Sequence, residues 1–213
     1  PSSALYFHGV FPFWLDNLIA VLLWVWFINL FNFMDGIDGI AGVESISIGL
    51  GVFLLMTMGN AQLVHGFLGL SIAAAALGFL WWNWQPAKIF LGDVGSVPLG
   101  FLLGWLLLEI LASPIWPAAV ILPLYYLADA TITLIRRTLR GEKVWRAHRE
   151  HYYQQATQRR LSHAKVTLFI GLANVLLIGL AFLSVNQPLL AIGGAIIVVA
   201  NLLLFMRGSS EKS

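Results

Sequence analysis

Hydrophobic residues run along most of this chain in long, unbroken stretches that short polar segments separate. Seven stretches suit helices that cross a bilayer: about residues 15–33, 44–59, 65–84, 97–113, 117–135, 165–185 and 188–206. None shows the alternation of apolar and polar residues that a membrane β-barrel needs. The pattern therefore predicts an all-α membrane protein, a polytopic bundle of about seven transmembrane helices.

Composition supports a membrane protein and excludes a soluble globular one. Of the 213 residues, 59% are hydrophobic and only 10% are charged, whereas soluble domains carry about 25% charged residues. The chain contains no cysteine, which excludes disulfides and cysteine-based metal sites. The bilayer is the expected surrounding, and no nucleic-acid partner is expected.

The basic residues divide the segments between the spans into two sets. All 12 Lys and Arg lie in or at the edge of 34–43, 85–96, 136–164 and the tail from Arg207. The start, 60–64, 114–116 and 186–187 have none. Because positive loops stay cytoplasmic, the first set is expected inside, with the N-terminus outside and the C-terminus cytoplasmic. Residues 1–206 are expected to form one transmembrane domain and 207–213 a disordered tail.

Residues 29–42, NLFNFMDGIDGIAG, follow an uncharged stretch and introduce polar residues at intervals of three. They are Asn29, Asn32, Asp35 and Asp38, and a glycine follows each aspartate. Residues three apart on a helix lie on one side, and glycine lets a helix end. A helix cap with a glycine turn is the simpler interpretation. Carboxylates at a membrane boundary are usually functional, so we interpret this stretch as part of a site.

A second polar segment, PAKIFLGDVGS at 86–96, lies in the next cytoplasmic loop. It holds one carboxylate, Asp93, between Gly92 and Gly95, and Ser96 is expected to cap the following helix. Glycines let a backbone approach a ligand, and a helix N-terminus favours phosphate. An aspartate there suits Mg²⁺, which keeps water and phosphate ligands as well. A tight turn with a helix cap is the alternative.

The third loop, 136–164, is long and basic and contains HREHYYQ at 148–154. Arg149 and the flanking His148 and His151 can hold a pyrophosphate by charge-assisted hydrogen bonds. An interfacial helix is the alternative for the histidine pair. A zinc site lacks a third ligand at a suitable spacing, and His163 is only a weak candidate.

Two further acidic residues lie close to the same face. Asp129, near the inner half of the fifth span, is expected either to pair with a basic residue or to act in catalysis. Glu44 is expected to cap the second span, because a helix N-terminus favours negative charge.

These three segments, in this order and on one face, resemble the polyprenyl-phosphate N-acetylhexosamine-1-phosphate transferases. The resemblance rests on NxxNxxDGIDGIAG at 29–42, PAKIFLGDVGS at 86–96 and HREHYYQ at 148–154, and it spans about residues 15–165. It implies transfer of a sugar-1-phosphate from a UDP-N-acetylhexosamine to a polyprenyl phosphate, such as undecaprenyl phosphate, with release of UMP. It also implies Mg²⁺ as cofactor, with Mn²⁺ as the alternative.

The resemblance further implies roles for individual loop residues. Asp93 is expected to bind the metal, with Asn32 beside it as a second metal residue. Asp35 and Asp38 are expected to shape the nucleotide and metal site. The implied catalytic set is Asp35, Asp38, Asp93, His148 and His151. The implied substrate-binding set is Asn32, Asn83, Lys88, Phe90 and Arg149.

Within this family, HREHYYQ is closer to the O-antigen-type members than to the three-histidine form of the peptidoglycan enzyme. Initiation of a cell-envelope polysaccharide such as lipopolysaccharide O-antigen is therefore expected, in a bacterial cytoplasmic membrane with the active site on the cytoplasmic face. The phospho-MurNAc-pentapeptide transferase is the alternative within the family, and a transporter subunit is the alternative of another class. A homo-oligomer is left open.

One departure concerns an aspartate pair. The family carries Asp-Asp in an earlier cytoplasmic loop, and this chain has no such pair and begins at Pro1. The sequence therefore predicts the C-terminal part of a longer enzyme.

Overall fold

The computed structural model describes residues 5–58, 63–143 and 148–208. The described residues form nine helices and no strand, which confirms the all-α prediction. The helices are α1 (Phe13–Phe33), α2 (Ile40–Met58), α3 (Leu63–Asn83), α4 (Gly92–Leu111), α5 (Pro117–Ile121), α6 (Leu124–Leu139), α7 (Tyr152–Gln158), α8 (His163–Leu183) and α9 (Pro188–Arg207).

Six of these helices, α1, α2, α3, α4, α8 and α9, are long and apolar enough to cross a membrane. Their most apolar windows have mean hydropathies between 1.7 and 2.6. Large apolar side chains point outward from the bundle, among them Val64, Leu77, Val175 and Leu189. Apolar surface on this scale is unfavourable in water and suits a lipid surrounding. The chain is therefore a multi-pass membrane protein.

The expected fifth span, 117–135, is not one continuous helix. It is divided into the five-residue α5 and the 16-residue α6, with Pro123 between them. Proline lacks the N–H that a continuous helix needs, which explains the break. At 16 residues α6 is shorter than the ~20 that a membrane span requires, and it has one buried face. The expected count of seven spans is therefore not confirmed.

Glycines bring the backbones of neighbouring helices together. A Cβ on Gly49 of α2 would lie 2.5 Å from the carbonyl oxygen of Gly69 on α3, and one on Gly69 would lie 2.8 Å from that of Gly49. Similarly, a Cβ on Gly100 of α4 would lie 3.1 Å from the Ile28 Cα of α1. Small residues at helix contacts are typical of membrane bundles, where close packing and not water exclusion drives association.

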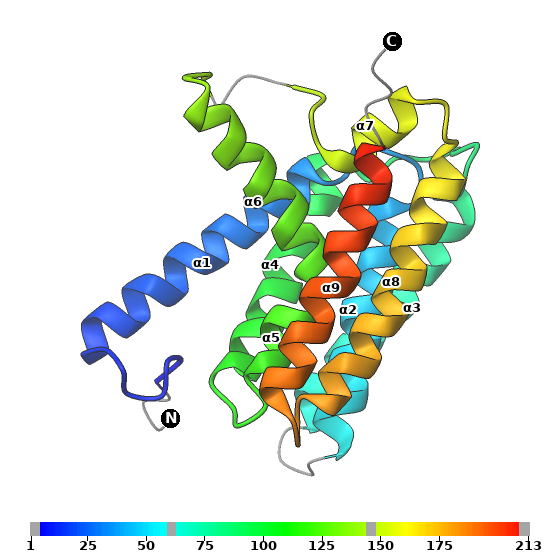
Figure 1. Cartoon of the computed structure of the whole chain (residues 1–213). Coiled ribbons are helices and arrows are strands. Elements are labelled where there is room, and N and C mark those ends of the chain that lie inside the picture. The colour runs from blue at the N-terminus through cyan, green and yellow to red at the C-terminus, as the bar shows by residue number, and fades with distance from the viewer. Residues whose placement is uncertain (1–4, 59–62, 144–147, 209–213) are drawn as a thin grey trace.

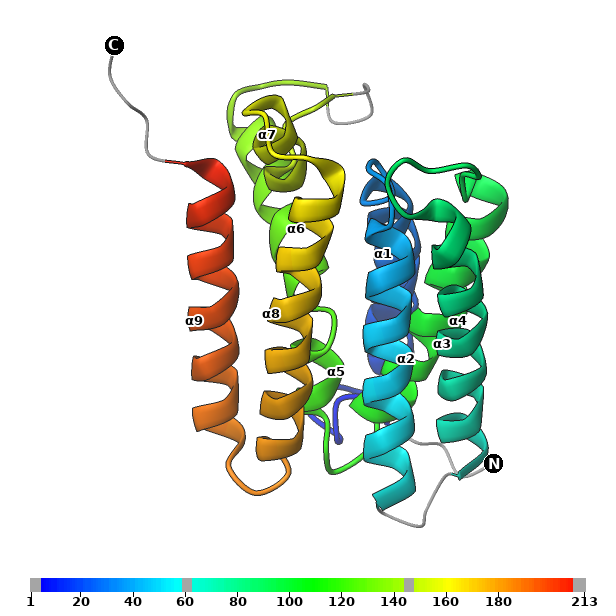
Figure 2. The ribbon, with the colours of Figure 1, turned by 90° about the vertical axis from the view of Figure 1, so that its right-hand side faces the viewer.

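The polar connections gather at one end of the bundle, the upper end in Figure 1. There α1, α3, α6 and α9 finish and α2, α4 and α8 begin, so that 34–39, 84–91 and the loop around α7 come together. Figure 2, turned by 90°, shows these connections at the same end. The three loops predicted to carry the site thus share one end of the molecule.

Some predicted helix boundaries are wrong. The structure begins α4 at Gly92, so Ser96 lies inside the helix and is not its cap. Likewise α2 begins at Ile40, and Glu44 does not cap it. Glu44 is fully buried and accepts a 2.7 Å hydrogen bond from Asn174 Nδ2 of α8. Of the expected disordered tail, Arg207 belongs to α9, and 209–213 lie outside the described residues.

Candidate active site

In the first polar stretch, helix α1 ends before the two aspartates. Because α1 ends at Phe33, Asp35 and Asp38 lie in the connection to α2 and do not continue a helical row. Asn29 is exposed, and its side-chain amide donates to the Val25 carbonyl within α1. Asn32 instead accepts a 2.5 Å hydrogen bond from Ser96 Oγ, which joins α1 to the first turns of α4. Asn32 therefore contacts the second motif segment, and Asn29 does not.

Two glycines allow the 34–39 connection to pack tightly. Gly39 has φ +80°, a conformation that side chains rarely adopt. A Cβ on Gly36 would collide with the Tyr153 hydroxyl, which sits over this connection and donates to the Phe33 carbonyl at 3.1 Å. Tyr153 follows the HREH segment, so the third loop contacts the first directly.

Asp38 joins three segments. Its carboxylate accepts a hydrogen bond from the Ala87 N–H at 3.2 Å, and its other oxygen lies 3.3 Å from Nδ1 of His163. The Asp38 carbonyl accepts from Thr167 Oγ1 at 2.9 Å. His163 and Thr167 lie on the first turns of α8. His163, which the sequence suggested only as a weak zinc ligand, is therefore a neighbour of the site.

The carboxylate of Asp35 receives no hydrogen bond from any described residue, although the residue is partly buried. Burial raises the pKa of Asp35 to about 6. The residue borders a cavity of about 230 Å³. The cavity is lined by Asp35, Gly36, Ile37, Asp38, Asn83, Phe90, Leu91 and Gly92. Two carboxylates, one of them unpaired, thus face a space between the first two loops.

The expected nucleoside residues occupy different positions at this cavity. Asn83 is buried, accepts from the Gly39 N–H at 2.9 Å and donates to the Ile89 carbonyl at 2.8 Å. Its amide therefore ties the first two loops together. Phe90 is exposed on the cavity wall. Lys88 is exposed and is not among the residues that line the cavity; its Nζ lies 5.3 Å from the centre of the Trp82 ring.

Asp93 lies in the first turn of α4 and is exposed. Within the described residues, no three or more His, Asp or Glu side chains form a group that could hold a metal ion. Mg²⁺ is usually bound by one or two carboxylates and keeps water and phosphate ligands. Asp35, which has no hydrogen-bonded partner among the described residues, and the exposed Asp93 are each carboxylates of the kind that Mg²⁺ binds.

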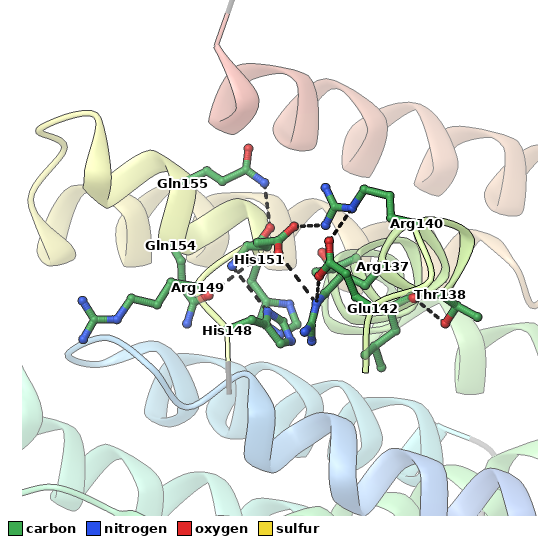
Figure 3. Close-up of polar contacts among 12 residues, drawn as sticks. Arg137, Thr138, Arg140, Glu142, His148, Arg149, His151, Gln154 and Gln155 are labelled. Carbon is green, nitrogen blue, oxygen red and sulfur yellow. Dashed lines mark hydrogen bonds and ion pairs between the residues drawn. The ribbon is translucent and has the colours of Figure 1, made fainter. Parts of the chain in front are cut away.

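Ion pairs shape the start of the basic loop (Figure 3). Buried Arg137 donates to Glu142 at 2.9 Å and lies 3.7 Å from Glu150. Arg140 pairs with the same two glutamates. These contacts bring the segment after α6 against the segment before α7. Arg149 is exposed, and the basic residue Arg146 lies outside the described residues.

One histidine of the pair, His151, contacts a buried carboxylate. His151 is almost completely buried, and its Nδ1 lies 3.2 Å from Oδ1 of Asp129. Its Nε2 has no hydrogen-bond partner among the described residues. The His148 and His151 rings are 4.9 Å apart, and burial, together with the charges of His151 and Arg137, lowers the pKa of His148. Pairing with a basic residue, one of the two roles expected for Asp129, is thus found, and the partner is His151 of the third motif.

Direct bonds connect all three loops. Besides the contacts of Asp38 and Tyr153, the Gln85 side chain accepts a 2.7 Å hydrogen bond from the Ala164 N–H at the start of α8. Of the residues expected in the first two loops, the structure places Asp35, Asp38, Asn83 and Phe90 around one cavity. Asn32, Lys88 and Asp93 are not among the residues that line it. The histidine loop adjoins them through Tyr153. Within the part of the chain that the structure describes, no hydrogen bond or ion pair links His148 or His151 to Asp93.

The fold and the site define a helical, multi-pass membrane protein whose polar motif loops gather at one end. Comparison with known sequences identifies its family. The chain belongs to glycosyl transferase family 4, whose sequence model matches residues 3–111, about half of the chain. The resemblance drawn from the three motifs is confirmed.

Curated relatives agree with this family. A probable undecaprenyl-phosphate N-acetylglucosaminyl 1-phosphate transferase of Bacillus subtilis is 32% identical, over 75% of this chain and 45% of the relative. The phospho-N-acetylmuramoyl-pentapeptide-transferase of Moorella thermoacetica is 32% identical, over 66% of this chain and 44% of the relative. That of Salinibacter ruber is 32% identical, over 74% of this chain and 46% of the relative. The chain thus spans less than half the length of these relatives.

Proposed function

We propose that this chain forms part of a Mg²⁺-dependent phosphoglycosyl transferase. The enzyme transfers an N-acetylhexosamine-1-phosphate from a UDP-sugar to a polyprenyl phosphate such as undecaprenyl phosphate and releases UMP. The observation that carries the proposal is the cavity of Asp35 and Asp38, which the first two motif loops enclose at one end of a membrane bundle. The activity named for the Bacillus subtilis relative supports the same reaction.

The reaction brings two anions together. An oxygen of the lipid phosphate attacks the β-phosphorus of the UDP-sugar and forms a new P–O bond. The bond from that phosphorus to the oxygen bridging the two phosphates breaks, and UMP leaves with the bridging oxygen. Such transfers depend on positioning and charge more than on covalent help from the protein. A lipid phosphate is already anionic near neutral pH, so a strong general base is unnecessary.

In this proposal the carboxylates form the cation side of the site. Asp93, Asp35 and Asn32 would hold Mg²⁺, which when bound supplies charge neutralisation for the pyrophosphate. Asp38 is kept in place by the Ala87 N–H and by its contact with His163. With a pKa of about 6, Asp35 is mostly ionised at neutral pH and available to a cation.

The histidine loop forms the phosphate side. Because its pKa is lowered, His148 is neutral at pH 7 in the free protein and can gain a proton beside a phosphate. Arg149 is exposed and supplies a permanent positive charge. Asp129 orients His151 through Nδ1, which leaves Nε2 as the free ring nitrogen. Phe90 and Lys88, both exposed, are assigned to the nucleotide.

Membrane placement follows from the charge pattern. We propose a bacterial cytoplasmic membrane with the site on the cytoplasmic face, the N-terminus outside and the C-terminus inside. In that orientation, a water-soluble UDP-sugar reaches the cavity from the cytoplasm and the lipid phosphate reaches it from the bilayer. We assign the product to initiation of a cell-envelope polysaccharide of the O-antigen kind.

A second candidate is the phospho-MurNAc-pentapeptide transferase reaction of peptidoglycan synthesis. It is supported by the similarity to the transferases of Moorella thermoacetica and Salinibacter ruber. A panel of UDP-N-acetylhexosamines and UDP-MurNAc-pentapeptide, assayed with the full-length protein and polyprenyl phosphate, separates the two. Transfer from only the pentapeptide substrate would establish the second candidate.

The substitution Asp93→Asn tests the proposed reaction. Loss of this charge should reduce Mg²⁺-dependent UMP release about 100-fold or more, the usual effect of removing a charged group that stabilises a transition state. Exchange of radiolabelled UMP into a UDP-sugar, in detergent with polyprenyl phosphate, measures it. Glu109→Gln is the matched control, because Glu109 lies near the opposite end of α4 beside His65. Normal exchange by Asp93→Asn would contradict the assignment of Asp93.

A further inference from the structure

A second polar cavity, here called the α6–α9 cavity, lies at the loop end of the bundle. Its volume is about 290 Å³. It is lined by Thr133, Arg136, Arg140, Glu150, Gln155 and Arg207. None of these residues lines the cavity of Asp35 and Asp38. The α6–α9 cavity is therefore a separate space, formed by α6, α7, α9 and the segment before α7.

Two of its three arginines have no ionic partner among the described residues. Arg136 is held with its guanidinium 5.2 Å from the centre of the Tyr152 ring. Arg207 is the last residue of α9 and is exposed. The third, Arg140, is paired with Glu150, so the only acidic residue of the lining is already neutralised. The cavity thus has surplus positive charge for an anion.

A further positive charge lies close to Arg207. The Arg159 guanidinium is packed against Gly208, the residue that follows α9. Arginine side chains in such groups suit phosphate, because the planar guanidinium offers several donors in a fixed geometry. Phosphate is therefore the chemical group that this arrangement fits.

Exposed apolar side chains lie close in sequence to the cavity arginines on both helices. Leu204 and Phe205, just before Arg207 on α9, are 65% and 52% exposed. On α6, Ile135 and Leu139 are 53% and 82% exposed. Because α9 is long enough to span a bilayer, its end marks the boundary between hydrocarbon and headgroups. A ligand here meets arginines at one end and hydrocarbon-facing side chains at the other.

His148 and the arginine side of the α6–α9 cavity lie on different sides of the third loop. In Figure 3, Arg140 and Gln155 lie on the side facing α9, whereas His148 lies toward the helices drawn in blue, α1 and α2. Neither His148 nor His151 lines the α6–α9 cavity. The cavity is not an extension of the proposed reaction site.

We propose that the α6–α9 cavity binds the phosphate of a lipid headgroup, with the hydrocarbon chains along the exposed apolar faces of α6 and α9. Two sources share this chemistry, an anionic phospholipid of the bilayer and a polyprenyl phosphate. The site does not depend on the proposed transfer reaction, because it uses none of the residues assigned to that reaction.

Native mass spectrometry of the delipidated full-length protein tests the site. The protein is titrated separately with phosphatidylglycerol, undecaprenyl phosphate, inorganic phosphate and a diacylglycerol of matched chains. The double variant Arg136→Gln/Arg207→Gln should bind the lipid phosphates about ten- to thirtyfold more weakly, the effect expected for two arginines at an anionic lipid. Arg207→Gln alone, at an exposed helix end, should give a smaller loss and covers the case in which the double variant misfolds.

Arg160→Gln/Lys165→Gln is the matched control, because it removes two exposed charges at the same end but outside the cavity. This control variant should change the affinity for lipid phosphates by less than about threefold. It reduces only the general attraction between the positive surface and the anionic lipid. Whichever lipid phosphate the cavity double variant weakens more identifies the source. Equal losses in the two double variants would overturn the site. So would diacylglycerol binding as tightly as phosphatidylglycerol, or inorganic phosphate displacing lipid at equal concentration.

Discussion

At the scale of single residues, the carboxylate of Asp129 organises the third loop. It contacts five groups, from α6 and from the residues that begin α7: the Tyr125 hydroxyl, Thr133 Oγ1, His151 Nδ1 and the N–H groups of Tyr152 and Tyr153. A buried carboxylate with this many donors is satisfied, and it fixes the tautomer of the histidine. One acidic residue thus sets both the position of the loop and the free nitrogen of His151.

We expect Asp129→Asn to reduce transfer activity of the full-length enzyme about 10- to 100-fold, as when other carboxylate–histidine pairs are broken. The NH₂ group of the new asparagine would face hydroxyl and N–H groups that donate to Asp129, so some of these hydrogen bonds would be lost. The rate should also change its pH dependence, because a negative charge beside the histidine loop is replaced by a neutral amide. A pH profile of kcat measures this effect.

Thr133→Val is the control for Asp129→Asn, since it removes only one of the five contacts, at 3.3 Å. It should cost about 1 kcal/mol of stability and leave the pH profile in place. If both variants lost activity with the same pH profile, Asp129 would have only a structural role.

At the scale of elements, small residues decide how closely the helices approach. The contact of α2 with α3 at Gly49 and Gly69 is backbone to backbone. The position of α2 matters for the site, because the connection that carries Asp35 and Asp38 leads directly into it. A change in this contact therefore acts on the cavity at the end of both helices.

Gly49→Ala should destabilise the protein by about 1–3 kcal/mol, because its Cβ would lie 2.5 Å from the Gly69 carbonyl oxygen. Gly78→Ala on α3 is the matched control, since its added Cβ would have no described atom within 4 Å apart from its chain neighbours and the backbone of its own helix. That change should be neutral or stabilise by up to about 1 kcal/mol through helix propensity. Thermal unfolding in detergent compares the two, and equal melting temperatures would contradict the close contact.

At the scale of the whole molecule, the helices deliver every motif loop to one end (Figure 1, Figure 2). The lysines and arginines of the described chain lie at that end, and the segments around 112–116 and 184–187 at the other carry none. A molecule with such a division of charge has one orientation that the positive-inside rule favours.

Cysteine labelling tests this orientation without background, since the chain has no cysteine of its own. In right-side-out membrane preparations, Asn186→Cys should react with an impermeant maleimide. Lys143→Cys should react only after permeabilisation. Both positions are exposed, and they lie at opposite ends of the bundle. The reverse labelling pattern would overturn the proposed cytoplasmic site.

The sequence alone determined the all-α membrane fold, the three motif loops and the family. These follow from properties that lie along the chain: hydrophobic length, the placement of charge and short motifs such as DGIDG and GDVGS. The expected spans agree with α1, α3, α8 and α9 to within a few residues, because a membrane helix needs a fixed length of apolar sequence. The roles of the individual site residues stay predictions.

The tertiary structure decided what depends on distant residues meeting. It joined Asp38 to His163 across 125 positions, placed Tyr153 over Gly36, and paired Asp129 with His151. It also divided the fifth span at Pro123 and buried Glu44 against Asn174. Hydropathy and spacing describe a residue by its neighbours along the chain, whereas hydrogen bonds and close packing depend on neighbours in space, which only the folded bundle supplies.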